Sequence, residues 1–311
     1  MLSRTLAIVG TVLLGMVPMV AAQPAPVTGT NEAAKVFAPP ADLRVTRDIV
    51  YARYGERELR LNLYLPPHPG QHPLPGVIVV GGSSWERSSK DAFDYVAGYL
   101  AKSGIAAATI AYRPASEARF PGAVQDVKAA VRWMRAEAAQ HGINPQALGV
   151  LGCSAGGQLA ALLATNHRDP TWEGAGGHEG VWSRVQAAVA MAPVTDLRNL
   201  SVFPPATVTL LEAFIGQPLP ALTEVRSAAS PITHVTSDSA PLLLIHSKTD
   251  AVIPYQQSTA LEGRYHDVGG SAELLAFDDA PHDFWSTTRW FPDAMQRAVA
   301  FFTRTLSSPG S

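Results

Sequence analysis

One short segment restricts the possible folds of this chain more than any other. It runs from Leu148 to Thr165 and reads "LGVLGCSAGGQLAALLAT". The first part has the short apolar composition of a buried strand, and the last part is rich in helix-forming residues. Between them lies Gly152–Gly156, a Gly-x-Ser-x-Gly pattern that marks a sharp turn between a strand and a helix. The segment therefore predicts a strand–turn–helix unit with Ser154 raised above the edge of a sheet.

The rest of the chain repeats this alternation of strands and helices. Leu59 to Pro66 alternates apolar and polar residues, which predicts a half-buried or edge antiparallel strand. Amphipathic helices are predicted over Lys90–Ser103, around Val124–Met134 and after Pro292. Alternating strands and helices predict an α/β fold whose mostly parallel central sheet has helices on both faces. Further buried strands are predicted in the runs "GVIVVGG", "IAAATIAYR", "VQAAVAMAP", "PLLLIHSKTD" and "AELLAFDDA".

The domain organisation follows from composition along the chain. Residues 1–22 combine Arg4, an apolar run and a small-residue cleavage site, which is the pattern of a secretory signal peptide. The alternative, an uncleaved membrane anchor, fits less well, because the apolar run is short and contains Pro18. Residues 23–50 are predicted to be a leader rich in Pro and Ala, and residues 51–306 a single catalytic domain. An insertion at about 195–240 is expected to form a small lid beside the site.

Charge and cysteine content limit the possible partners. The formal net charge is −2 without runs of like charge, so the chain has no electrostatic footprint for nucleic acid. The single cysteine excludes an intrachain disulfide. We expect a secreted or periplasmic protein, with no stable membrane insertion of the mature form, that acts on a small molecule. One loop gathers possible metal ligands, but their spacing matches no known pattern, so we predict a polar loop and no metal site: His167, Asp169, Glu173, His178 and Glu179.

Ser154 needs two partners to act as a nucleophile, a base that accepts its proton and an acid that orients the base. Asp250 follows the predicted strand in "PLLLIHSKTDAVIP", and His282 follows the next one in "LLAFDDAPHDFW". The order Ser, Asp, His is the one expected for this fold. Because the carboxyl ends of parallel strands meet at one edge of the sheet, we predict that the three side chains lie together.

Neighbouring residues are weaker candidates for these roles. Cys153 precedes the centre of the turn, so we predict that its thiol packs in the core. His246 is expected to support the loop of Asp250 rather than to act as the base. Three carboxylates are too near His282 in sequence to reach it from the preceding strand: Asp278, Asp279 and Asp283. The remaining histidines are expected at the surface: His68, His72, His141, His234 and His266.

An oxyanion hole is the third requirement of such a site. One backbone N–H donor is expected from Ala155, at the start of the helix behind the nucleophile. The other is expected from Gly82 or Ser83, in the loop "GGSSW" after the strand "GVIVV". The alternative for this loop is an ordinary tight turn. Trp85 either forms a wall of the substrate pocket or packs beneath it.

With these motifs the chain resembles the α/β-hydrolase superfamily. Within it, the chain is most similar to small secreted esterases of the feruloyl-esterase-like, acetyl-xylan-esterase and hormone-sensitive-lipase-like branches. The similarity extends from about Leu59 to Phe302 and includes "GCSAGGQLAALLAT", "APVTDL", "ASPITHV", "HSKTDAVIP" and "PHDFW". The resemblance implies the same nucleophile, acid, base and oxyanion donors. In one departure, Gly81 stands where the family usually has a histidine before the oxyanion glycines.

The predicted function is a serine carboxylic-ester hydrolase for short acyl or aryl esters, carbohydrate esters among them, without a cofactor. The basis for the short acyl group is the insertion, which is modest in size and not continuously apolar. Two alternatives stay open at this point. One is an amide or formamide hydrolase or a peptidase with the same triad, and the other is an inactive hydrolase fold used for binding, which only the altered "GGSSW" loop supports.

Overall fold

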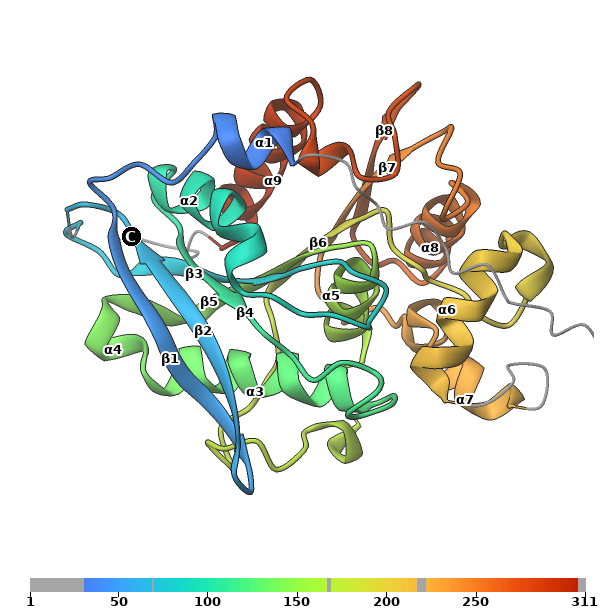
Figure 1. Cartoon of the computed structure of the whole chain (residues 1–311), viewed down its shortest axis with the longest axis horizontal. Coiled ribbons are helices and arrows are strands. Elements are labelled where there is room, and N and C mark those ends of the chain that lie inside the picture. The colour runs from blue at the N-terminus through green and yellow to red at the C-terminus, as the bar shows by residue number, and fades with distance from the viewer. Residues whose placement is uncertain (1–30, 69, 167–168, 217–221, 307–311) are drawn as a thin grey trace, which may run out of the picture.

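A twisted sheet crosses the part of the chain that the computed structural model describes, residues 31–68, 70–166, 169–216 and 222–306 (Figure 1). Its strands lie in the order β1-β2-β4-β3-β5-β6-β7-β8. β1 and β2 pair antiparallel, as do β2 and β4, and the other neighbours are parallel. The predicted mostly parallel sheet is thus confirmed. The strands are β1 Arg44–Tyr54, β2 Arg57–Leu65, β3 Leu74–Val80, β4 Ala106–Ile110, β5 Ile143–Cys153, β6 Ala187–Met191, β7 Leu242–Ser247 and β8 Ala272–Phe277.

Helices cover both faces of this sheet. One face is packed by α1 Glu32–Val36, α2 Asp94–Lys102 and α9 Phe291–Leu306. The other is packed by α3 Gly122–Ala136, α4 Ala138–His141, α5 Ala155–Thr165 and α8 Gln256–Asp267. Two further helices, α6 Pro205–Ile215 and α7 Thr223–Ala228, lie together at one end of the molecule, near α8 (Figure 1). Short 3-10 turns are η1 Asp91–Phe93, η2 Pro170–Trp172, η3 Leu200–Val202, η5 Pro231–His234 and η6 Phe284–Ser286.

The burial of strand β5 on both faces explains why its sequence is apolar almost throughout. Leu148 and Val150 point into the core beneath α3 and α5. Leu151 and Cys153 point into the core beneath α2 and α9. A strand covered on both faces needs apolar residues at every position, so it reads as a continuous run rather than as an alternation.

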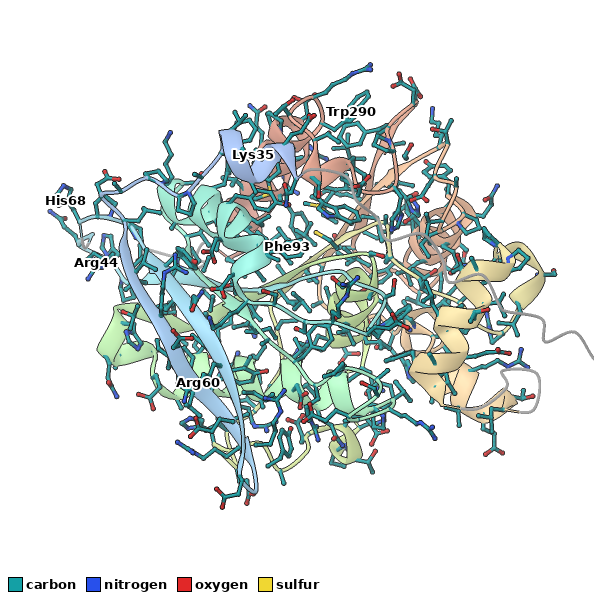
Figure 2. All side chains as sticks on the ribbon, viewed as in Figure 1. Lys35, Arg44, Arg60, His68, Phe93 and Trp290 are labelled. Atoms are coloured by element: carbon teal, nitrogen blue, oxygen red, sulfur yellow. The ribbon has the colours of Figure 1, made fainter. Side chains whose placement is uncertain are left out.

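The folded part of the chain begins before the boundary predicted at residue 51. Ala33 in α1 is fully buried, and β1 starts at Arg44 and pairs with β2 as far as Tyr54. Composition did not reveal this strand because much of it is polar and exposed. Figure 2 shows Arg44 and Arg60 on this outer two-stranded ribbon. Residues that composition assigned to a leader thus belong to the sheet.

The predicted signal peptide, residues 1–22, lies outside the described residues. Among the helices of the described part, none is both long and apolar enough to cross a membrane.

Candidate active site

The turn after β5 is as sharp as the glycine pattern predicts. Ser154 adopts φ 53° and ψ −117°, a backbone conformation that residues other than glycine rarely adopt. A Cβ at Gly152 would lie 2.0 Å from the carbonyl oxygen of Gly156, and a Cβ at Gly156 would lie 2.1 Å from that of Val80. Only glycine fits at these two positions, so the pattern is required by backbone packing. The turn places Ser154 at the carboxyl edge of β5 and at the N-terminus of α5.

The structure brings Ser154, His282 and Asp250 together at this edge. The Nε2 atom of His282 lies 3.0 Å from the Oγ atom of Ser154. The Nδ1 atom of His282 lies 2.7 Å from the Oδ2 atom of Asp250. Asp250 follows β7 and His282 follows β8, so the loops after adjacent parallel strands supply the base and the acid. The chain of two hydrogen bonds is the geometry that activates a serine hydroxyl.

Asp250 is held in a fixed orientation by further contacts. Its side chain is fully buried, and its Oδ1 atom accepts hydrogen bonds from the backbone N–H groups of Val252 at 2.8 Å and Ile253 at 2.9 Å. Burial raises the pKa of the Asp250 carboxyl. Hydrogen bonds from His246 and His282, and then from the backbone of Ile253, outweigh burial and hold that pKa well below its usual value. The carboxylate is therefore ionised at neutral pH beside the imidazole.

His246 supports the acid, as its position in the strand predicts. Its ring is fully buried, and its Nε2 atom lies 3.2 Å from Oδ2 of Asp250 and 3.0 Å from the carbonyl oxygen of Ile253. Its Nδ1 atom lies 2.7 Å from the hydroxyl of Ser258. The direct contact with the carboxylate was not foreseen. The four-residue spacing between His246 and Asp250 was the available signal.

Cys153 is structurally separate from this group. Its side chain is fully buried in the core beneath α9, with Sγ 3.9 Å from the Sδ atom of Met191. Burial raises the pKa of this thiol well above its ordinary value, so the reactive thiolate is disfavoured. Of the adjacent thiol and hydroxyl, only the hydroxyl lies beside the imidazole.

The loop after β3 lies against the nucleophile turn. A Cβ at Gly82 would lie 2.8 Å from the carbonyl oxygen of Cys153 and 3.1 Å from the Cβ atom of Ser154. Ser83, Ser84 and Trp85 all have positive φ angles, of 153°, 57° and 58°. Successive residues in this strained conformation turn the loop tightly. The loop thus passes beside Ser154, where the sequence predicts the second oxyanion donor, and both Gly82 and Ser83 remain candidates.

The departure at Gly81 has a steric explanation. A Cβ at this position would lie 2.7 Å from two carbons of the Phe93 ring, a residue shown in Figure 2. The Phe93 ring occupies the space that a side chain at position 81 would need. The hydroxyl of Tyr112 donates a hydrogen bond of 3.3 Å to the carbonyl oxygen of Gly81. Phe93 and Tyr112 therefore support the loop, and no local sequence pattern predicts either contact.

Trp85 packs beneath the site and joins it to the insertion at 195–240. The indole is 3% exposed and stacks on Phe214 of α6, with ring centroids 4.7 Å apart. The same apolar cluster contains Ala155 and Ile253, which adjoin the nucleophile and the acid. Of the two roles predicted for Trp85, the structure thus shows packing beneath the site. The cluster that contains Trp85 also lies directly next to Ser154.

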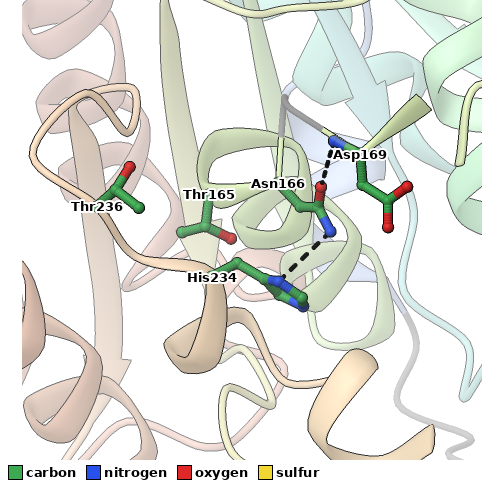
Figure 3. Close-up of a pocket in the computed structure, with 5 residues that line it drawn as sticks. All are labelled: Thr165, Asn166, Asp169, His234 and Thr236. Carbon is green, nitrogen blue, oxygen red and sulfur yellow. Dashed lines mark hydrogen bonds between the residues drawn. The ribbon is translucent and has the colours of Figure 1, made fainter. Parts of the chain in front are cut away.

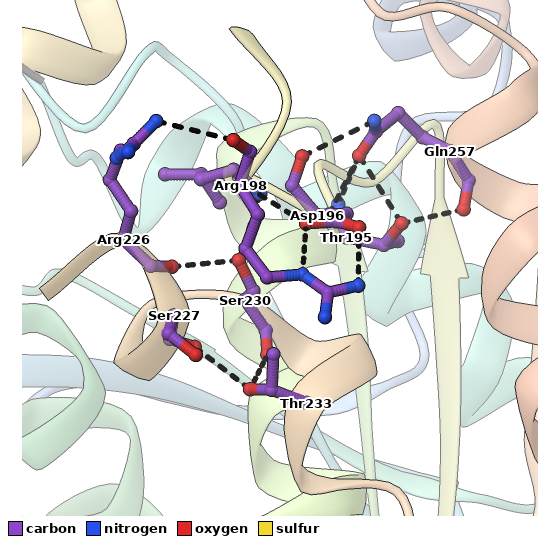
Figure 4. A network of polar contacts seen from close by, with 9 residues as sticks. Thr195, Asp196, Arg198, Arg226, Ser227, Ser230, Thr233 and Gln257 are labelled. Carbon is purple, nitrogen blue, oxygen red and sulfur yellow. Dashed lines mark hydrogen bonds and ion pairs between the residues drawn. The ribbon is translucent and has the colours of Figure 1, made fainter. Parts of the chain in front are cut away.

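The insertion itself is fixed to helix α8 by a polar network (Figure 4). The Oε1 atom of Gln257 on α8 accepts hydrogen bonds from the backbone N–H groups of Thr195 and Asp196, both at 2.8 Å. The Ser230 hydroxyl accepts from the N–H of Leu197 at 2.8 Å and donates to the carbonyl oxygen of Arg226 at 2.7 Å. These contacts tie the loop after β6 to both α8 and the α7 region. The prediction that the insertion acts as a lid stays a prediction.

The polar loop from residue 166 onward is held by charged residues of α3. Glu173 contacts Lys128 at 2.8 Å and Arg132 at 2.9 Å. Asp169 accepts hydrogen bonds from the N–H and hydroxyl of Thr171. Within the described ranges, no three His, Cys, Asp or Glu side chains gather as metal ligands. His167 lies outside those ranges.

A small cavity beside this loop contains one of the histidines expected at the surface. The cavity measures about 310 Å³ and is lined by Thr165, Asn166, Asp169, His234 and Thr236 (Figure 3). His234 is only partly exposed, and its Nε2 atom lies 2.8 Å from the carbonyl oxygen of Ala228. Burial lowers the pKa of His234, which favours the neutral ring. The prediction of a surface histidine was therefore wrong for His234, because the η5 turn folds it inward.

Comparison with known proteins assigns this chain to a family. The BD-FAE family model matches residues 61–265. A probable carboxylic ester hydrolase of Mycobacterium tuberculosis, LipM, is 31% identical over 255 residues, which are 78% of this chain and 58% of LipM. Ethyl acetate hydrolase of Pseudomonas putida is 31% identical over 239 residues, or 73% of this chain and 71% of that protein.

A solved structure extends the similarity to three dimensions. A truncated carbohydrate esterase from gut microbiota superposes with a TM-score of 0.77 at 27% identity, over 87% of this chain and 99% of that one. The chain spans little more than half the length of LipM, so the two proteins are compared only over that part. The matched family model, together with the superposed fold, shows that this chain belongs to the BD-FAE family and has the α/β-hydrolase fold.

Proposed function

We propose that this chain hydrolyses carboxylic esters through an acyl-enzyme intermediate on Ser154. The observation that carries the proposal is the continuous hydrogen-bond chain from Ser154 through His282 to the buried Asp250 carboxylate. The family relationship supports it, since relatives are named as carboxylic ester and ethyl acetate hydrolases.

In the first half of the reaction, the hydroxyl of Ser154 attacks the ester carbonyl carbon while its proton passes to Nε2 of His282. The Asp250 carboxylate orients the imidazole and stabilises the imidazolium. The negative charge on the carbonyl oxygen is stabilised by the N–H of Ala155 and by that of Gly82 or Ser83. When the C–O bond breaks, His282 returns the proton to the departing alcohol, and the acyl group remains on Ser154.

In the second half, water replaces the alcohol. His282 removes a proton from the water, whose oxygen attacks the acyl carbon. The proton then returns to Ser154 as the carboxylic acid leaves. Every step uses groups of the chain and water.

The proposed substrates have short acyl or aryl groups, and carbohydrate esters are among them. The apolar face of α6 supports this limit, because Leu211 and Phe214 are buried against the loops of the site rather than facing an open channel. The names of two similar proteins, an ethyl acetate hydrolase and a carbohydrate esterase, point the same way.

A chain-length series tests the proposal. The wild-type protein and Ser154→Ala are each assayed with p-nitrophenyl esters from acetate to palmitate. We expect turnover of the short esters, and a loss of about 10⁴-fold or more in the variant. Inertness toward every ester and toward a fluorophosphonate label would mean a binding function instead. Faster cleavage of anilides or formyl amides than of esters would make the chain an amide hydrolase.

We also propose that the protein is exported and acts in the periplasm or the medium. The motivating pattern is the charged, apolar and small-residue sequence over residues 1–22. N-terminal sequencing of protein recovered outside the cytoplasm should begin at Gln23. An intact N-terminus in the cytoplasmic fraction would contradict export.

A further inference from the structure

We infer that a second, non-catalytic site lies at the opposite edge of the sheet and binds a pyranose unit of a polysaccharide. It centres on Trp182, a tryptophan that is 45% exposed. Large exposed aromatic side chains on a folded protein often mark interaction sites.

Trp182 lines a cavity of about 430 Å³. Pockets for small molecules commonly measure ~300–1,000 Å³, so a single sugar unit has enough room. The residues around the cavity precede the cores of β5, β6 and β7, whereas Ser154 follows β5. Gln146 precedes Ser154 by eight residues, so with a rise of about 3.3 Å per residue β5 puts roughly 25 Å between the cavity and the nucleophile. The cavity is thus separate from the candidate active site.

The indole is held in place before any ligand arrives. The guanidinium of Arg135 lies over the ring at 4.4 Å from its centre. Arg135 is itself buried and donates hydrogen bonds to the backbone carbonyl oxygens of Pro145, Trp182 and Arg184. One ring face is thus covered by a fixed cation, and nearly half of Trp182 is exposed to solvent. A rigid aromatic surface loses little conformational entropy on binding.

The lining of the cavity favours a neutral hydroxylated ligand. Among the residues that the structure describes, no acidic side chain lines the cavity. Its polar residues carry amides, hydroxyls and a guanidinium: Gln146, Arg184, Gln186, Ser239 and Thr305. Sugar hydroxyls both donate and accept hydrogen bonds, so they match this mixture. The C–H face of a pyranose is apolar with slight positive charge at its hydrogens, and the face of an indole is negative. A lipid chain would form no hydrogen bonds with this polar lining, whereas sugar hydroxyls can.

Binding to insoluble xylan and to microcrystalline cellulose tests the inference. The parent protein is Ser154→Ala, so that no ester is cleaved and the result does not depend on hydrolysis. We expect the parent to bind one of the two polysaccharides, and Trp182→Ala to weaken that binding about tenfold. Trp182→Tyr, which keeps an aromatic face, should bind within about twofold of the parent.

Two controls separate binding from folding. Gln146→Ala changes an exposed side chain and should weaken binding about threefold without affecting the fold. When Trp182→Ala is made in the wild-type protein, which keeps Ser154, hydrolysis of p-nitrophenyl acetate should be unchanged. The inference is overturned if the parent binds neither polysaccharide, if Trp182→Ala and Gln146→Ala both bind as the parent does, or if the protein is retained only by lipid vesicles or an unrelated protein.

Discussion

Tyr112 supports the loop after β3 through one hydrogen bond, from its hydroxyl to the carbonyl oxygen of Gly81. The Tyr112 side chain is buried, so removing the hydroxyl leaves that carbonyl without this donor. If the loop supplies an oxyanion donor, a small shift of its backbone weakens transition-state stabilisation. Tyr112→Phe should therefore lower kcat for p-nitrophenyl acetate about three- to tenfold, with little change in KM.

Tyr265→Phe is the matched control for this change. Tyr265 lies on α8, away from the nucleophile, and is also buried. Its hydroxyl donates a hydrogen bond of 3.1 Å to the carbonyl oxygen of Ala240. Both variants should lower the melting temperature by similar amounts, and only Tyr112→Phe should lower kcat. Equal kcat values for the two variants would show that the Tyr112 contact has no role in positioning the loop.

The lowered pKa of Asp250 predicts how the free energy of unfolding depends on pH. Its pKa in the folded protein lies below the unfolded value of about 3.9, so ionised Asp250 stabilises the fold above that pH. This contribution is lost as the pH falls through the folded pKa. The difference in unfolding free energy between wild type and Asp250→Asn should therefore shrink as the pH is lowered from about 5 to about 2.

Urea unfolding at a series of pH values measures this difference. Asp279→Asn serves as the control, because the Asp279 side chain is 60% exposed and pairs with Arg289 at the surface. Its unfolding free energy should follow that of the wild type throughout. If the difference in unfolding free energy between wild type and Asp250→Asn stays constant with pH, the lowered pKa of Asp250 does not stabilise the fold. At pH 7 the same Asp250→Asn variant should lose about 10⁴-fold in kcat.

Among the elements, helix α6 packs into the apolar cluster that adjoins the nucleophile. Phe214 is 1% exposed and stacks on Trp85, in the apolar cluster that also contains Ala155. Phe214→Val removes most of the ring and opens room next to the site. The ratio of kcat/KM for octanoate to that for acetate should rise about fivefold or more, since each buried CH₂ contributes about 0.8 kcal/mol.

The control for α6 is Phe301→Val on α9. Phe301 is equally buried, but it lies in the core on the face of the sheet covered by α2 and α9. Both variants should lose stability, and only Phe214→Val should change the preference for acyl length. An unchanged octanoate-to-acetate ratio in Phe214→Val would mean that α6 does not limit the acyl group.

The elements differ in how well sequence predicted them. β5 and β7 were predictable because strands buried on both faces are continuous apolar runs, and Ser154, Asp250 and His282 follow strands that end at one edge. β1 was missed, since an exposed outer strand carries no such run. The contacts of Phe93 with Gly81 and of Phe214 with Trp85 were also missed. They join segments far apart in the chain, and no local pattern reports which distant side chain fills a given space.

For the molecule as a whole, buried charge ties the polar loop after α5 to helix α3. Lys128 and Arg132 on α3 have side chains only 2% exposed, and both contact the carboxylate of Glu173. Arg132 also donates to the carbonyl oxygens of Glu173 and Gly177. Burial raises the pKa of Glu173, but hydrogen bonds from Lys128 and Ser183 outweigh it and keep that pKa below its usual value. One carboxylate thus compensates two desolvated cations.

Glu173→Gln removes this compensation and should lower the unfolding free energy by about 2–3 kcal/mol, because both cations stay buried without their counter-charge. Glu273→Gln is the matched control. Glu273 also pairs with two cations and is similarly exposed, at 31% against 34%, but Arg297 and Arg304 are about half exposed. Exposed pairs contribute only about 0–1 kcal/mol, so this variant should change little. Urea unfolding measures both, and equal losses would show that burial of the cations does not determine how much Glu173 stabilises the fold.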